Sequence, residues 1–237
     1  MFKLFLLASI YIFASNQNNK IQIASIQFKV IQNGDSDRRY IWLHGDEQTA
    51  RIALENHMKK NQGKAFLVEG ILRESEFYGG IIDLNRVFST LGAKANIQKY
   101  NPTWTRIQKQ ERLLIIEKDR KIFFKNIFPK NGELLIALHN NYKGYNINKE
   151  LGRSDAISIK KDQNPRDFFI CTSRSDFEIL SQSPFNVVFQ EKSPKKDDGS
   201  LSWAAIRNDI RYINIETRLG WLSQQNKMLN YIEKNLR

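Results

Sequence analysis

Short apolar runs alternate along the chain with longer segments in which apolar residues recur at helical spacing. The segment 46–60 shows the helical pattern, because Ala50, Ala53 and Leu54 fall on one face. Strands that alternate with helices favour a mixed, mainly parallel sheet with helices on both faces. A chain of 237 residues is long enough for one sizeable core. The sequence therefore predicts a single α/β domain.

The same pattern sets the expected element boundaries. Strands are expected at 21–31, 39–45, 64–70, 132–140, 166–173, 186–190 and 211–217. Helices are expected at 46–60, 105–128, 175–182 and 222–236. Asp46 is expected to cap the first helix, and Pro129 to follow the end of the second.

The first residues have the layout of a secretory signal peptide. Lys3 is followed by an apolar stretch at 4–14 and then by small and polar residues. About 11 apolar residues are too few to cross a hydrocarbon layer of ~30 Å, so we do not expect an integral membrane protein. We expect residues 1–15 to be removed on export, and residues 16–237 to form the mature domain in the periplasm or outside the cell.

The charge balance is strongly basic, with a formal net charge of +12. Such a field attracts anionic partners. The basic residues are scattered and do not alternate with aromatic residues, so the sequence predicts no nucleic-acid partner. A basic binding domain that holds an anionic cell-surface polymer, without catalysis, is the alternative to an enzyme.

Polar residues that suit a metal site end three of the predicted strands. His44, His139 and Glu216 fall there, and ligands of α/β sheets collect at the carboxyl ends of strands. Glu47 follows His44 by three residues, and Gly45 between them permits a tight backbone. A catalytic zinc site uses three such ligands and leaves a fourth position for water. Taken alone, the spacing also fits a hydrogen-bonded turn histidine and a glutamate that favours the start of a helix.

The motifs "HGDE" at 44–47 and "DLNRVF" at 83–88, with the later His139 and Glu216, resemble the zinc carboxypeptidase superfamily. The branch most similar contains the aspartoacylase and succinylglutamate desuccinylase deacylases. The resemblance covers 42–216 in order and implies a carboxypeptidase-like, phosphorylase/hydrolase-like fold for residues 16–237. It implies Zn²⁺ as the cofactor and these roles: His44, Glu47 and His139 as zinc ligands, Asn85 and Arg86 as the substrate-carboxylate clamp, and Glu216 as the catalytic carboxylate.

What the resemblance implies about function is zinc-dependent hydrolysis of an amide or peptide bond next to a free carboxylate. A metallocarboxypeptidase and an N-acyl amino acid deacylase both fit. The expected substrate is a small peptide or N-acyl amino acid, with a cell-wall peptide as one form of it.

Further side chains are candidates for supporting roles. We expect Arg73 to stabilise the oxyanion, with Arg207 and Arg211 as alternatives. The loop 193–203 is expected to border the site, with Asp198 as a partner of a histidine ligand. His57 is expected to pack on its helix.

Overall fold

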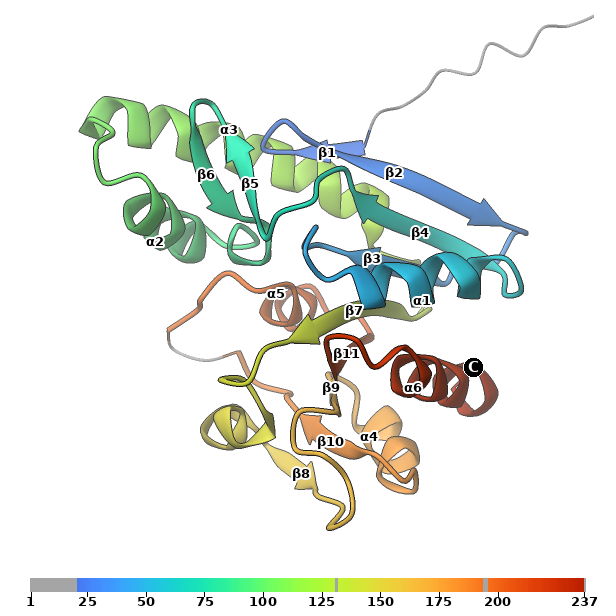
Figure 1. Ribbon diagram of the computed structural model, residues 1–237. Coiled ribbons are helices and arrows are strands. Elements are labelled where there is room, and N and C mark those ends of the chain that lie inside the picture. The colour runs from blue at the N-terminus through green and yellow to red at the C-terminus, as the bar shows by residue number, and fades with distance from the viewer. Residues whose placement is uncertain (1–20, 131, 194–195, 237) are drawn as a thin grey trace, which may run out of the picture.

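The computed structural model describes residues 21–130, 132–193 and 196–236 (Figure 1). A nine-stranded sheet forms its centre, in the order β1-β2-β4-β3-β7-β11-β9-β10-β8. These strands are β1 (Ile21–Ile23), β2 (Ile26–Asn33), β3 (Arg39–Trp42), β4 (Gly63–Val68), β7 (Leu135–Asn141), β8 (Ala156–Ser158), β9 (Phe168–Cys171), β10 (Asn186–Phe189) and β11 (Tyr212–Arg218). A separate hairpin pairs β5 (Glu74–Phe77) with β6 (Gly80–Asp83).

The central strands of the sheet are parallel. β4, β3, β7 and β11 are parallel to one another. β9 and β10 are parallel to each other but run opposite to β11, and the remaining neighbours are antiparallel. β7 is buried at every position, because helices cover both faces of the sheet there. The predicted α/β class, with one large mixed sheet flanked by helices, is confirmed.

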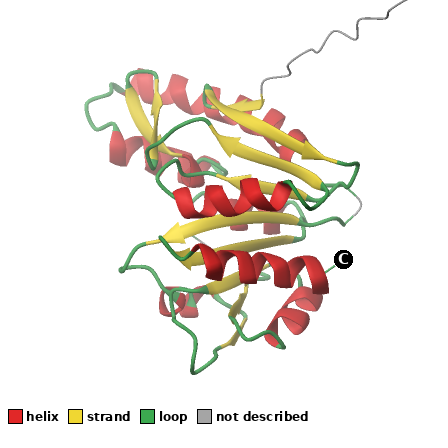
Figure 2. Ribbon diagram, turned by 45° about the vertical axis from the view of Figure 1, so that its right-hand side comes forward, coloured by secondary structure: helices red, strands yellow, loops and turns green. Residues whose placement is uncertain are grey.

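Helices cover the sheet in two layers. They are α1 (Gln48–Met58), α2 (Thr90–Tyr100), α3 (Arg106–Ile127), α4 (Arg174–Ser181), α5 (Leu201–Arg207) and α6 (Leu222–Asn235). Figures 1 and 2 show α1 and α6 side by side on one face, with α3 and α5 on the other. On the α3 face, Phe123 packs against Phe28 of β2 and stacks on Phe88. Tyr231 of α6 donates a hydrogen bond to the Ile179 carbonyl of α4, which joins these helices on the α1 face.

Two local predictions are wrong. The segment 21–31 is not one strand, because Ala24 and Ser25 both have positive φ and turn the chain into the β1–β2 hairpin. Asp46 does not cap α1: the N-cap position is Glu47, and the carboxylate of Asp46 accepts a hydrogen bond from the Tyr142 hydroxyl.

No helix in the described ranges is long and apolar enough to span a membrane. The predicted signal peptide at 1–15 lies outside the described residues.

Candidate metal centre

The carboxyl edge of the parallel strands brings together the three strand-end candidates, His44, His139 and Glu216, and the nearby Glu47. His139 of β7 and Glu216 of β11 are direct partners in the register of the two strands. His44 follows the end of β3, and Glu47 stands at the N-cap of α1. The loop between them is tight, and the Gly45 amide donates to the Leu72 carbonyl at 2.9 Å.

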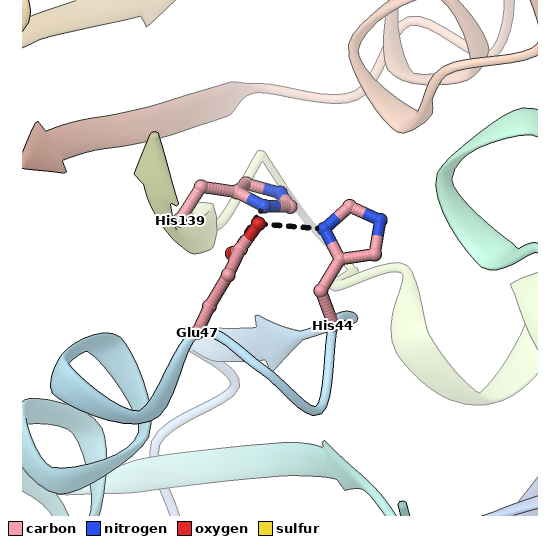
Figure 3. A group of neighbouring side chains, drawn as sticks. All are labelled: His44, Glu47 and His139. Atoms are coloured by element: carbon pink, nitrogen blue, oxygen red, sulfur yellow. Dashed lines mark hydrogen bonds and ion pairs between the residues drawn. The ribbon is translucent and has the colours of Figure 1, made fainter. Parts of the chain in front are cut away.

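The side chains of His44, Glu47 and His139 converge on one point (Figure 3). Glu47 Oε1 lies 2.8 Å from His44 Nδ1, and Glu47 Oε2 lies 2.9 Å from His139 Nδ1. One ligand atom from each residue lies within 4.8 Å of the other two, and all three residues are at most 3% exposed. Two imidazole nitrogens and a carboxylate oxygen form a ligand set that zinc accepts.

The close approach of these atoms requires either a proton or a metal ion between them. When both rings are neutral with Nδ1 unprotonated, all three converging atoms are hydrogen-bond acceptors and repel one another. A proton on the rings or a metal ion removes that conflict. Burial lowers the pKa of His44, but the charge of Glu47 and the hydrogen bonds with Asp83 and Glu47 outweigh it and raise the pKa to about 9. The residues present therefore fit a bound divalent metal.

Asp83 orients the first histidine. Its Oδ1 lies 2.9 Å from His44 Nε2, and its own position is fixed because the Asn85 amide donates to the same oxygen. Burial raises the pKa of Asp83, yet the hydrogen bond and charge of His44 hold it below its usual range. A carboxylate on the far nitrogen of a ligand histidine fixes the tautomer and makes the ligand more basic.

The prediction that Asp198 supports a histidine is wrong. Its carboxylate instead contacts Arg153 Nη1 at 3.3 Å and accepts from the Ser200 amide at 3.1 Å. Asp83 holds the position that Asp198 was expected to hold. It was visible in the sequence as the first letter of "DLNRVF", but its proximity to His44 depends on how the β5–β6 hairpin packs.

Glu216 is buried beside the cluster. Its two oxygens accept hydrogen bonds from Asn214 Nδ2 at 3.0 Å and from Asn141 Nδ2 at 3.2 Å. Burial raises the pKa of Glu216, although the charge of His139 and these two hydrogen bonds act against that. A carboxyl group whose pKa moves toward neutrality can both accept and return a proton at physiological pH.

The predicted clamp residues lie in the same cavity, which has a volume of about 310 Å³. Asn85 Oδ1 accepts from the Leu201 amide of α5 at 2.9 Å, which leaves its amide nitrogen available. Arg86 donates to the Asn85 carbonyl at 2.7 Å and has no ion-pair partner among the described residues. Arg73 Nη1 donates to Glu47 Oε1 at 2.9 Å. All three line the cavity that His44, Glu47 and His139 also line.

Some of the other predicted side chains lie away from the cavity and some line it. Arg211 pairs with Asp176, and Arg207 pairs with Asp197 and donates to the Phe88 carbonyl, so both are engaged away from the cavity lining. His57 is buried against Tyr40 and Glu233, which agrees with a packing role. From the 193–203 loop and the start of α5, four described residues line the cavity: Asp198, Ser200, Ser202 and Trp203.

Sequence reasoning missed several lining residues. Asn141 ends β7 and Gln190 follows β10, so both share the strand-end position that identified the histidines. Tyr145 and Glu150 come from the irregular segment after β7, where no periodicity marks them.

Comparison with solved structures finds a distant likeness. No family model matches the chain, and no curated protein matches it. A solved structure, N-formylglutamate amidohydrolase from Ralstonia eutropha JMP134, is 11% identical, with 87% of this chain and 98% of that one covered and a TM-score of 0.36. A likeness at that score carries no argument, so any assignment of activity depends on the motifs and on the geometry of the site.

Proposed function

We propose that this protein is a zinc-dependent hydrolase that cleaves an amide or peptide bond next to a free carboxylate. The observation that carries the proposal is the convergence of His44, Glu47 and His139 within 4.8 Å of one another, with Glu216 in register beside His139. Three buried ligands and an adjacent buried carboxylate are the minimum set for metal-assisted hydrolysis with a general base.

His44 Nδ1, His139 Nδ1 and the Glu47 carboxylate would hold the metal. A zinc ion bound there supplies Lewis acidity, which lowers the pKa of a water molecule and polarises the scissile carbonyl. Asp83 keeps His44 in the tautomer that presents Nδ1. The backbone amide of Asn140 donates to Glu47 Oε2 at 3.1 Å and so helps to fix the position of the Glu47 carboxylate.

Glu216 acts as the general base and then as the general acid. It accepts a proton from the attacking water while the water oxygen bonds to the carbonyl carbon. It then gives that proton to the leaving nitrogen as the C–N bond breaks, so the products are a carboxylate and an amine. Its raised pKa suits both steps.

Arg86 and Asn85 bind the substrate carboxylate. Arg86 offers a planar, permanently charged fork that no described acid occupies, and Asn85 offers an amide donor beside it. Arg73 is the candidate for stabilising the oxyanion, since its guanidinium already lies against the ligand Glu47.

The substrate class follows from this clamp and from the size of the cavity. A small peptide with a free carboxyl end, or an N-acyl amino acid, places a carboxylate next to the scissile bond. The signal-like residues 1–15 support an exported enzyme, for which a cell-wall peptide is a suitable substrate.

The test is a screen of N-acyl amino acids against peptides with free C-termini, with and without a chelator. We expect about one zinc per chain and hydrolysis that the chelator abolishes. If the protein refolded with zinc retains none, the proposal is wrong. Salt-sensitive binding of an anionic polymer that survives Glu216→Gln, without any hydrolysis, would instead support the binding-domain alternative.

A further inference from the structure

A buried acid that has no cationic partner in the described part of the chain lies in the same cavity as the metal cluster. Glu150, between the 3₁₀ turns Ile147–Lys149 and Leu151–Arg153, is 6% exposed. The Tyr145 hydroxyl and Gln190 Nε2 each donate to its carboxylate at 2.9 Å, and both donors are neutral. Lys149, next to it in sequence, is exposed, and Arg153 pairs with Asp198. Buried carboxylates are normally paired with a cation, so Glu150 is conspicuous.

Two residues that line the same cavity each carry a buried amide oxygen without a partner. Gln190 is 1% exposed, and because its Nε2 donates to Glu150, its Oε1 is left without a hydrogen bond. Asn214 is 6% exposed, and because its Nδ2 donates to Glu216, its Oδ1 is likewise left without one. The carboxylate acceptors fix both amide orientations, so neither oxygen can be exchanged for a nitrogen. Each unmet acceptor costs free energy in the folded protein.

These acceptors contrast with the donors elsewhere in the cavity lining. Arg86 and Asn85 offer donors for an anion, whereas the Glu150 carboxylate, Gln190 Oε1 and Asn214 Oδ1 are acceptors. Tyr145 lies near both carboxylates: burial, then the charges of Glu216 and Glu150, raise its pKa, so it stays a neutral donor. Asn214 of the acceptor group donates to Glu216 at 3.0 Å, so this group reaches the proposed catalytic carboxylate.

We infer that Glu150, Gln190 and Asn214 form a subsite for a primary ammonium group of the substrate. A primary ammonium carries three donors and no acceptor, which matches one carboxylate and two amide oxygens. The inference rests on the proposed function for its context, and it narrows the substrate to a molecule with both a carboxylate for Arg86 and a primary amine for Glu150.

The test measures binding by calorimetry and does not depend on turnover. The ligands are Nα-acetylated 2,4-diaminobutyrate, ornithine and lysine, each against its methyl isostere: Nα-acetylated norvaline, norleucine and 2-aminoheptanoate. We expect at least one amine to bind the wild type about 10- to 100-fold more tightly than its isostere, as for a buried charged hydrogen bond. In Glu150→Gln the preference falls to about twofold or less, while the isosteres bind as before.

Two further variants complete the design. Glu191→Gln makes the same chemical change at a neighbouring exposed position and should keep the preference. Gln190→Met removes one acceptor and should reduce the preference, which keeps the test informative if Glu150→Gln does not fold. The inference is overturned if amines and isosteres bind equally at every length, if Glu150→Gln weakens both equally, or if Nα-acetylarginine binds more tightly than every primary amine. A protein that binds amines selectively but hydrolyses nothing with zinc would refute the proposed function alone.

Discussion

Glu216 and His139 are direct partners across the parallel pairing of β11 with β7, so the proposed base and a proposed zinc ligand share one level of the sheet. The pairing of Tyr212 with Leu135 at the start of the two strands fixes this level. Backbone hydrogen bonds of two buried central strands therefore hold the base beside the metal cluster. A site built on strands in this way is more rigid than one built on loops.

The first prediction concerns the metal ligands. His139→Ala removes one of three ligands and leaves the Glu47 carboxylate with one fewer neighbour, so we expect stoichiometric zinc binding to be lost. Metal analysis after dialysis against zinc and gel filtration measures it. The third histidine of the chain provides the control, because His57 lies against Glu233 and Tyr40 and His57→Gln should keep its zinc. Equal zinc content in both variants would contradict the assignment.

Asp83 gives a prediction that separates orientation from ligation. Asp83→Asn leaves the three ligands in place but replaces the carboxylate that bonds His44 Nε2. We expect zinc affinity to fall about 10- to 100-fold. Competition with a chromogenic chelator measures the change. Asp46→Asn is the matched control: Asp46 lies between the two ligands in sequence, but its carboxylate bonds Tyr142, so affinity should not change.

The tight turn between His44 and Glu47 gives a third prediction. A Cβ on Gly45 would lie 2.6 Å from the backbone of Gly70 and 2.7 Å from the Ile71 amide nitrogen, and the backbone cannot yield as a flexible side chain would. Gly45→Ala should cost about 1–3 kcal/mol of unfolding free energy. It should also weaken zinc binding, because Gly45 lies in the turn between the proposed ligands His44 and Glu47. Gly144→Ala, in the same cavity lining but with nothing within 4 Å, should change neither. Urea denaturation and chelator competition give the two readouts.

How much of this arrangement the sequence reveals depends on how local the signal is. His44, His139 and Glu216 were predictable because each ends an apolar run, and parallel strands collect such ends at one edge. The contact of Asp83 with His44 was not, because it depends on the packing of a hairpin whose strands span only four residues each.

The acceptor group around Glu150 had no sequence signal. Glu150, Gln190 and Asn214 come from three separate segments, and only the order of the strands brings them together. The loop predicted at 193–203 overlaps the start of α5, a helix of seven residues that is too short for two full turns of periodic pattern. The β1–β2 turn was hidden for a different reason: Ala24 and Ser25 are ordinary strand-compatible residues that adopt positive φ here.

Acid stability gives a fourth prediction, remote from the metal cluster. Glu233 of α6 pairs with Arg38 Nη1 at 3.0 Å and accepts from the Tyr40 hydroxyl at 2.6 Å. Burial raises its pKa, but the hydrogen bonds of His57 and Tyr40 and the charge of Arg38 outweigh burial and lower it from 4.5 to about 2. A depressed carboxylate pKa stabilises the fold above pH 4.5, and this contribution is lost as the pH falls toward 2.

The loss amounts to roughly 3 kcal/mol at most. Glu233→Gln should therefore lower stability at pH 7 and flatten its dependence on pH between 4.5 and 2 relative to the wild type. Urea unfolding at a series of pH values measures this. Glu178→Gln, at an exposed position on α4, should leave the curve of the wild type unchanged. Parallel curves for wild type and Glu233→Gln would show that the contacts of Glu233 add no acid-sensitive stability.

The last prediction separates the base from the metal. Glu216→Gln keeps a buried side chain of the same shape and adds a donor, but it removes the carboxylate that we propose accepts the proton of the attacking water. We expect the variant to retain zinc and its Kd for a carboxylate product, while kcat falls about 10²- to 10⁴-fold, the range for loss of a general base. The contrast with His139→Ala, which should lose metal and turnover together, is the diagnostic result. If Glu216→Gln loses its zinc, the carboxylate holds the metal cluster together and is not the base. If it keeps both zinc and full turnover, proton transfer depends on another group.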